Sequence, residues 1–162
     1  MILVDFNQVV ISNFMIQVGA HTNIPLDESM LRHMILNTIR AYRQKFVEDF
    51  GELVICCDSK RYWRKEVFPF YKAGRKKDRQ SSGVDWNTMF ATLNKVRQEL
   101  VDVFPYKTIL VDGAEADDII GCISRNVTNE KILILSSDKD FIQLHTNPNV
   151  KQYSPVLKKF VR

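Results

Sequence analysis

The sequence predicts an α/β domain in which a mostly parallel, twisted sheet has helices on both faces. Short apolar runs of strand length alternate with amphipathic helical patterns along the 162 residues, and such alternation is typical of a parallel sheet covered on both sides. The length fits one domain, for which roughly 100–200 residues is usual. Hydrophobic residues make up 45% of the chain, which excludes a disordered tail and allows a core without disulfides.

The first half of the chain contains two predicted strands and two predicted helices. Residues 1–5 are a short buried strand, and residues 25–49 have apolar side chains three and four positions apart, which predicts an amphipathic helix closed by Gly51. A second buried strand covers 53–57. A helix capped by Asp85 follows. Its predicted inward side chains are Trp86, Phe90, Leu93, Val96 and Leu100.

The second half continues the alternation. A strand at 108–111 leads into a helix around 114–127, and a strand at 131–135 follows. A further strand, predicted to form a hairpin, lies just before Arg162. No repeat, low-complexity tract or linker interrupts the pattern, so we expect a single domain over residues 1–162.

Several classes of protein are excluded by what the sequence lacks. The longest apolar runs, such as 53–57 and 132–135, fall far short of the roughly 18 residues of a membrane helix. The first residues are Met-Ile-Leu-Val-Asp, without the basic region that opens a signal peptide. The three cysteines form neither a disulfide framework nor a zinc set. We therefore expect a soluble, cytoplasmic protein without membrane contact.

The positive charge is concentrated in one segment. Residues 60–79 contain nine basic and two acidic side chains, a local +7 within a net charge of +4, so the rest of the chain is negative. Aromatic side chains lie between the basic ones, which is typical of a nucleic-acid contact, although a solvated loop is the alternative. The expected contact residues are Lys60, Arg61, Arg64, Lys65, Tyr71, Lys72, Arg75, Lys76, Lys77 and Arg79.

Acidic side chains follow all four predicted parallel strands. Ligands bind beyond the carboxyl ends of such strands, so these acids should share one edge of the sheet. Like charges so close destabilise a fold unless a cation offsets them, and oxygen ligands without His or Cys suit Mg²⁺ or Mn²⁺. For isolated acids such as Asp112 and Asp118, the alternative is that they cap helices or face water. The candidate ligands are Asp5, Asp58, Glu115, Asp117, Asp118, Asp138 and Asp140.

Two metal ions beside a basic segment suit phosphodiester hydrolysis, because a metal pair stabilises the attacking and leaving oxygens of an in-line displacement. Lys72 and Arg75 are spaced to neutralise the scissile phosphate, with simple phosphate tracking as the alternative. The candidate catalytic set is Lys72, Arg75 and Asp138.

Several strings resemble the flap endonuclease and 5′-nuclease family, which has a PIN-like fold, and within it the ribonuclease H branch of T-even-like phages. They are LRHMILNTIR at 31–40, YKAGR at 71–75, EADD at 115–118, SSDKDF at 136–141 with QLH at 143–145, and NVKQYSP at 149–155. The resemblance covers essentially the whole chain and implies a PIN-like three-layer domain. It also implies that residues 60–84 match the family's helical arch or the disordered counterpart of that arch, with Lys72 and Arg75 at its foot.

The resemblance implies roles for the acids. Asp5, Asp58, Glu115, Asp117 and Asp138 would hold the first Mg²⁺ and Asp140 would lean to the second, with Mn²⁺ as a substitute; Asp118 matches the family cluster less firmly. Family members remove RNA primers or displaced flaps from the 5′ end during replication. The implied substrates are DNA and RNA–DNA hybrids with a free 5′ end or flap, and a single-strand-binding protein or clamp is a plausible partner by analogy.

Members of this family continue with a helix–turn–helix element that grips duplex DNA and with a further metal-binding aspartate, and residues 1–162 contain neither. We therefore expect an incomplete second metal site, in a fragment of a longer nuclease or in a short form that needs a second polypeptide. The alternatives are a nucleic-acid-binding module that does not cut, a PIN-like ribonuclease of toxin type, and a hydrolase of small phosphate esters.

Overall fold

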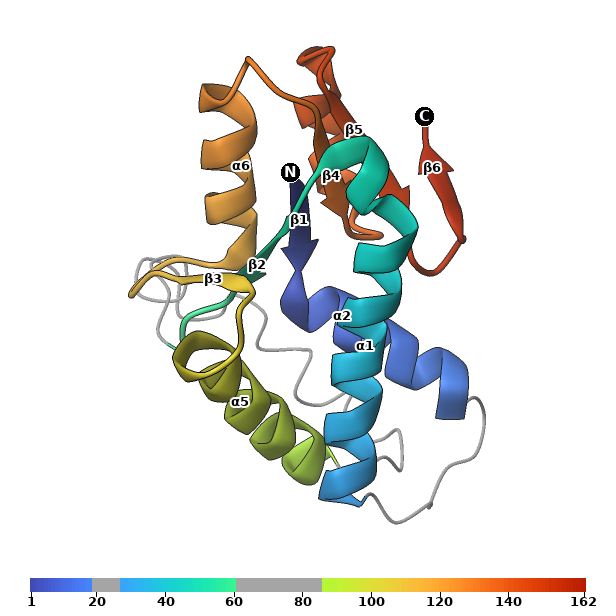
Figure 1. The fold of residues 1–162 in the computed structure, drawn as a ribbon, viewed down its shortest axis with the longest axis vertical. Helices are drawn as coiled ribbons and strands as arrows, with labels where there is room; N and C mark the ends of the chain where they lie inside the picture. Colours follow the sequence, from blue (N-terminus) through green and yellow to red (C-terminus); the bar gives the residue numbers. More distant parts are fainter. Residues whose placement is uncertain (19–26, 61–85) are drawn as a thin grey trace.

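The computed structural model describes residues 1–18, 27–60 and 86–162 (Figure 1). Within them one sheet contains the strands β1 (Ile2–Asp5), β2 (Leu53–Cys57), β3 (Lys107–Leu110), β4 (Ile132–Leu135), β5 (Val150–Ser154) and β6 (Lys159–Val161). The strand order is β3-β2-β1-β4-β5-β6. Every neighbouring pair is parallel except β5 and β6, which form an antiparallel hairpin. The predicted mostly parallel sheet is confirmed.

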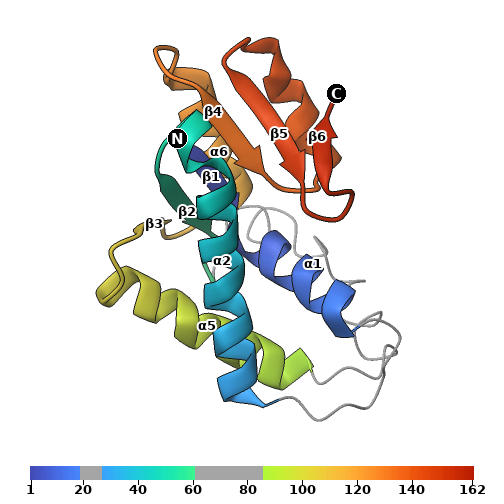
Figure 2. The same cartoon turned by 45° about the vertical axis from the view of Figure 1, so that its right-hand side comes forward.

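Helices cover both faces of this sheet. The described helices are α1 (Phe6–Val18), α2 (Glu28–Phe50), α5 (Trp86–Asp102), α6 (Ala116–Asn126) and the 3₁₀ helix η1 (Lys139–Thr146). Buried side chains of α1, α2 and α5 pack on one face, and those of α6 and η1 pack on the other. Figures 1 and 2 show the resulting layers, with α2 and α5 crossing and α6 on the opposite side of β1 and β2.

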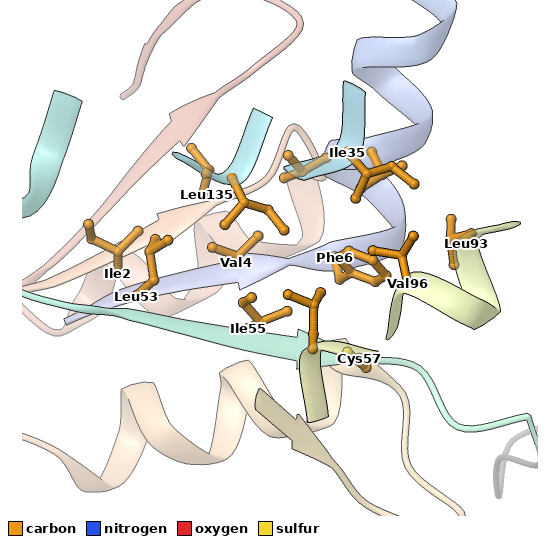
Figure 3. Close-up of a cluster of buried hydrophobic side chains, with 14 of the residues drawn as sticks. Ile2, Val4, Phe6, Ile35, Leu53, Ile55, Cys57, Leu93, Val96 and Leu135 are labelled. Atoms are coloured by element: carbon orange, nitrogen blue, oxygen red, sulfur yellow. The ribbon is translucent and has the colours of Figure 1, made fainter. Parts of the chain in front are cut away.

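The strands are apolar throughout because both of their faces are buried. In β1, Ile2 and Val4 belong to the cluster under α1, α2 and α5, whereas Leu3 belongs to the cluster under α6 and η1. In β2, Ile55 likewise belongs to the first cluster and Cys56 to the second. Figure 3 shows the first cluster, where strand side chains meet Phe6 and the inward stripes of α2 and α5. This double burial explains the continuous apolar runs that predicted the strands.

Most predicted elements lie within two or three residues of their observed bounds. Helix α2 begins after Asp27, whose side chain accepts a hydrogen bond from the Ser29 N–H at 3.0 Å. It ends at Gly51, whose φ of 95° favours glycine and whose N–H donates to Val47 O. In α5, Trp86 is only partly buried, and Asp85 lies outside the described residues.

Three elements, α1, η1 and β5, were not anticipated from their own patterns. Helix α1 follows β1 directly, and apolar side chains lie on nearly all sides of it, so the helical period is weak even though Phe6, Val10 and Phe14 are buried. Strand β5 was anticipated only as part of a family string. It is a fifth parallel strand, paired with β4. No helix in the described part of the chain is long and apolar enough to cross a membrane.

Candidate metal centre at the carboxyl edge of the sheet

Four adjacent parallel strands end at the same edge of the sheet, which we call the carboxyl edge. Asp5 is the last residue of β1, and Asp58 follows β2 directly. The connection after β3 leads to Glu115, the N-cap of α6. Asp138 follows β4 and is the N-cap of η1. The topology therefore brings the predicted strand-end acids to one edge, as the sequence led us to expect.

Asp5 is buried at this edge, with 5% of its surface exposed. Its Oδ2 accepts a hydrogen bond from Ser136 Oγ at 3.0 Å. Burial, together with the nearby charges of Asp117, Asp58 and Asp138, raises the pKa of Asp5 well above its usual value, although the Ser136 bond opposes the rise. The negative charges of the three other acids therefore act on Asp5.

Asp58 is held by three contacts from different elements. Its Oδ1 accepts from Ala116 N at 2.6 Å, at the first turn of α6. Its Oδ2 accepts from Asn7 Nδ2 at 3.2 Å. Its main-chain oxygen accepts from Nη1 of the buried Arg97 at 2.8 Å. The carboxylate of Asp58 is thus held by α1 and α6, and its main chain by α5.

The three acids at the start of α6 have different surroundings. Glu115 is buried, with 1% of its surface exposed, and its N–H donates to Asp118 Oδ2 at 3.0 Å. Asp118 thus closes the first turn of α6, which is the capping role that the sequence left open for it. Asp117 is half-buried. The positive end of the helix dipole favours negative charge at these positions.

Asp138 and Asp140 lie in the loop that leaves β4. Asp138 Oδ1 accepts from Asp140 N at 2.9 Å, and Asp138 N donates to Ser136 Oγ at 3.2 Å. Asp140 is exposed, and it is absent from the charges that act on Asp5. Asp138 therefore belongs to the group around Asp5, whereas Asp140 lies at its rim.

The chemistry of this donor set fits a hard divalent cation. The side chains are carboxylates, and their repulsion at Asp5 is the cost that a bound cation would offset. Within the described ranges, however, no three His, Cys, Asp or Glu side chains converge as a ready-made cation site. The acids share an edge and an electrostatic field without forming a closed cage.

The predicted basic segment, residues 60–79, lies outside the described residues except for Lys60. Lys60, at the end of the described range, is exposed. The other candidate nucleic-acid contacts, including the candidate catalytic pair Lys72 and Arg75, lie outside the described residues.

A groove of about 570 Å³ lies away from these acids, along α2. It is lined by Asn13 of α1, by α2 side chains from Met30 to Lys45, and by Tyr153 and Lys158 of the β5–β6 hairpin. None of the candidate ligands lines it. The predicted metal ligands therefore lie at the carboxyl edge and not in this groove.

The side chains that hold the acids were missed by the sequence analysis. Asn7, Ser136 and Arg97 contact Asp58 or Asp5 from distant positions in the chain. One signal was available: Arg97 is a cation within the inward stripe of α5, between Val96 and Leu100. Asn7 and Ser136 show no pattern of their own, because their partners are set by the tertiary fold.

The described fold and its acidic edge define a class of protein, an α/β domain with strand-end carboxylates suited to divalent cations. The chain matches the family described as 5′-3′ exonuclease, N-terminal resolvase-like domain, over residues 1–161. The chain therefore belongs to this family. The resemblance identified from the sequence strings is confirmed.

Relatives support the same assignment. Ribonuclease H of Enterobacteria phage T4 is 40% identical over 99% of this chain and 53% of its own length. A 5′-3′ exonuclease of Buchnera aphidicola subsp. Acyrthosiphon pisum is 34% identical over 63% of this chain and 34% of its own length. The chain thus spans about half or less of the length of these relatives.

Solved structures confirm the PIN-like fold. T5 5′-exonuclease with bound divalent metal ions (zinc) superposes with a TM-score of 0.67 at 18% identity, over 100% of this chain and 57% of that one. The bacteriophage T5 D15 flap endonuclease in a complex with DNA and metal ions gives a TM-score of 0.65 at 18% identity, over 99% and 57%. At this identity the likeness shows the fold alone.

Proposed function

We propose that this chain is the catalytic domain of a Mg²⁺-dependent, structure-specific 5′ nuclease, a 5′-3′ exonuclease or flap endonuclease. The observation that carries the proposal is the buried Asp5 carboxylate, on which the charges of Asp58, Asp117 and Asp138 act together. Acids whose pKa is strongly shifted by burial and by neighbouring charges occur more often at functional sites than elsewhere. Membership of the 5′-3′ exonuclease family supports the same reaction.

The acids of the carboxyl edge would hold the cations. Asp5, Asp58, Glu115, Asp117 and Asp138 form the proposed first site, with Asp118 closing the adjacent helix turn and Asp140 leaning to a second site. When bound, a divalent cation supplies Lewis acidity, which lowers the pKa of water and offsets charge on phosphoryl oxygens. Mg²⁺ is the proposed ion, with Mn²⁺ as a substitute, because every ligand is an oxygen.

The basic segment would position the nucleic acid. Lys72 and Arg75 are proposed to neutralise the scissile phosphate, and the remaining cations of residues 60–79 to bind the strand. The substrates are proposed to be branched DNA or an RNA–DNA hybrid with a free 5′ end, as in primer removal. A phage ribonuclease H among the relatives and a DNA complex among the structural neighbours support this class of substrate.

We propose residues 1–162 as one domain, assisted by a second polypeptide or by further chain that grips duplex DNA. A replication partner such as a single-strand-binding protein or clamp is proposed by analogy only. One observation favours a second candidate function, binding without cutting: no three acids converge as a ready-made cation site among the described residues.

The test is cleavage of two 5′-labelled substrates, a DNA flap and an RNA–DNA hybrid, in Mg²⁺, Mn²⁺ or chelator. We expect short, metal-dependent products. Asp138→Asn should lower the cleavage rate more than about 100-fold. Mutating a residue that only orients a metal ligand already costs about 10–100-fold in affinity or activity, and Asp138 is a proposed ligand itself. Binding measured in chelator should be unchanged or slightly tighter, because a repulsive charge is removed.

Two results would contradict the proposal. Salt-sensitive flap binding with no cleavage in either metal favours the binding module. Cutting of single-stranded RNA with no requirement for a 5′ end favours a toxin-type ribonuclease.

A further inference from the structure

Two family-like strings, residues 143–145 and 149–155, contain none of the candidate metal ligands. In the structure they supply His145 and Gln152, which meet below the loop that leaves β4. We propose that Gln152 is a positioning residue that sets Asp138 and Asp5 for cation binding, and that His145 orients it. The proposal rests on the proposed metal centre and names residues that act on it through the main chain.

Gln152 is fully buried in β5, opposite Ile134 of β4. Its Nε2 donates two hydrogen bonds into the loop that follows β4. One reaches the main-chain oxygen of Ser136 at 2.9 Å, and the other reaches the main-chain oxygen of Asp138 at 2.8 Å. Both protons of a single buried amide therefore fix the segment from which Asp138 projects.

The other end of the same amide is held by η1. Because Nε2 faces two carbonyl oxygens, Oε1 of Gln152 must be the accepting atom. It lies 3.0 Å from His145 Nε2, so His145 donates to it. His145 thereby fixes the orientation of the amide. A flipped amide would place an oxygen against two carbonyl oxygens.

The loop that follows β4 in turn positions the carboxylates of Asp5 and Asp138. Ser136 Oγ donates to Asp5 Oδ2 at 3.0 Å and accepts from Asp138 N at 3.2 Å. Asp138 is therefore held at its N–H by Ser136 and at its carbonyl by Gln152. The loop is also held from α1, where Gln8 Oε1 accepts from Ser137 N at 3.1 Å.

A purely structural glutamine and a positioning glutamine differ in what their loss would change. An apolar replacement would leave two buried carbonyls without donors, which costs stability in either case. Only a positioning role predicts that cation affinity changes as well, because residues that orient metal ligands affect affinity by about 10–100-fold.

The test uses Gln152→Glu, which keeps the shape and removes the donor, with Gln44→Glu on the exposed face of α2 as the matched control. Mn²⁺ binding is measured by calorimetry, cleavage by kcat and KM on the labelled flap, and flap binding in chelator. We expect Mn²⁺ affinity and kcat of Gln152→Glu to fall about 10–100-fold while flap affinity stays constant. The control should match the wild type.

His145 gives a second, milder variant, because it is only partly buried. His145→Leu should weaken Mn²⁺ binding in the same direction as Gln152→Glu, and His145→Gln, which restores a donor, should recover part of the loss. These two variants decide the question if Gln152→Glu does not fold.

The outcomes separate the two proposals. A wild type that binds Mn²⁺ but cleaves nothing contradicts the proposed function and leaves the positioning role standing if the variants bind more weakly. Variants that bind Mn²⁺ as tightly as the wild type, with only a lower melting temperature, overturn the positioning role. A wild type that binds no divalent cation overturns both.

Discussion

Asp5 is a buried acid at the end of a central strand, and ionising it is unfavourable in the folded chain. Burial and three neighbouring acids raise its pKa well above the ordinary 3.8. The folded chain therefore binds this proton more tightly than the unfolded chain does. As the pH rises above about 3.8, Asp5 loses its proton in the unfolded chain but keeps it in the folded chain. The free energy of unfolding therefore falls with rising pH until the raised pKa of the folded chain is passed.

Replacing Asp5 by asparagine should therefore stabilise the metal-free protein at neutral pH. The amide can still accept the hydrogen bond from Ser136 Oγ, and the repulsive charge is gone. Thermal unfolding in chelator should show a higher melting temperature for Asp5→Asn at pH 7, with a difference that shrinks as the pH approaches 4.

The same variant should lose most of the stabilisation that added Mg²⁺ or Mn²⁺ gives the wild type, because ligands of the folded state raise its stability by mass action. Asp49→Asn, at an exposed position of α2, is the matched control and should behave as the wild type. A melting temperature for Asp5→Asn below that of the wild type in chelator at pH 7 would contradict the repulsion argument.

At this scale the sequence predicted the acids but not their partners. Asp5, Asp58 and Asp138 were predictable because each follows a strand, and parallel strands bring their ends together. The hydrogen bonds that hold them join residues far apart in the chain, such as Ser136 to Asp5 and Asn7 to Asp58. Such pairs depend on the register of the sheet, which a single sequence does not specify.

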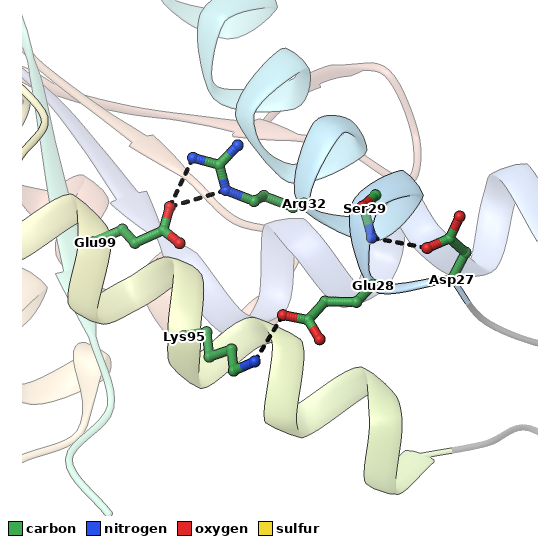
Figure 4. A network of polar contacts seen from close by, with 6 residues as sticks. All are labelled: Asp27, Glu28, Ser29, Arg32, Lys95 and Glu99. Carbon is green, nitrogen blue, oxygen red and sulfur yellow. Dashed lines mark hydrogen bonds and ion pairs between the residues drawn. The ribbon is translucent and has the colours of Figure 1, made fainter.

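Helices α2 and α5 are joined by exposed polar contacts above their apolar interface (Figure 4). Arg32 Nη2 lies 2.8 Å from Glu99 Oε2, and Lys95 Nζ lies 2.8 Å from Glu28 Oε1. These side chains are well exposed, so each ion pair contributes little to the stability of the fold. The helices are held mainly by buried side chains such as Ile35 and Leu93.

The N-cap of α2 should matter more than these ion pairs. Asp27 accepts from the Ser29 N–H, one of the N–H groups that a helix start leaves without a helical partner. Asp27→Ala should lower the free energy of unfolding by about 1 kcal/mol, and Lys95→Gln should change it by less. Urea unfolding measures both. An equal or larger loss for Lys95→Gln would contradict this ranking.

The elements that were predicted have clear local signals, and those that were missed lack them. Helix α2 has a polar cap, an apolar stripe and a closing glycine, and β2 is a pure apolar run. Helix α1 has no separate cap, because Asp5 ends β1 and Phe6 begins the helix. In strand β5, Lys151 is exposed and Gln152 is buried. Because a polar glutamine is not expected in a core, the sequence of β5 does not show the apolar run that predicts a buried strand.

The acidic and the basic side chains of the chain are concentrated in different parts of its sequence. The carboxyl edge gathers acids at the ends of four strands, whereas residues 60–79, between β2 and α5 in the chain, have a local charge of +7. Under the proposed function, a polyanionic nucleic acid has to approach acids that repel it. We expect the basic segment to supply the attraction, and bound cations to remove the repulsion.

The salt dependence of binding tests this arrangement. Each phosphate contact contributes roughly −0.9 to the slope of log affinity against log salt for duplex DNA. The double variant Lys76→Ala, Lys77→Ala should therefore reduce the magnitude of the slope by about 2, that is, by about 1 for each phosphate contact removed. The measurement is fluorescence anisotropy of a labelled flap in chelator, between low and physiological salt.

Lys107→Ala provides the control for this experiment. Lys107 is exposed at the first residue of β3, and so lies at the opposite edge of the sheet from the acids. Its removal lowers the net charge without touching the proposed contact, and the slope should stay constant. If Lys107→Ala and the double variant changed the slope equally per charge, binding would follow net charge alone. A slope near zero in the wild type would contradict an electrostatic contact altogether.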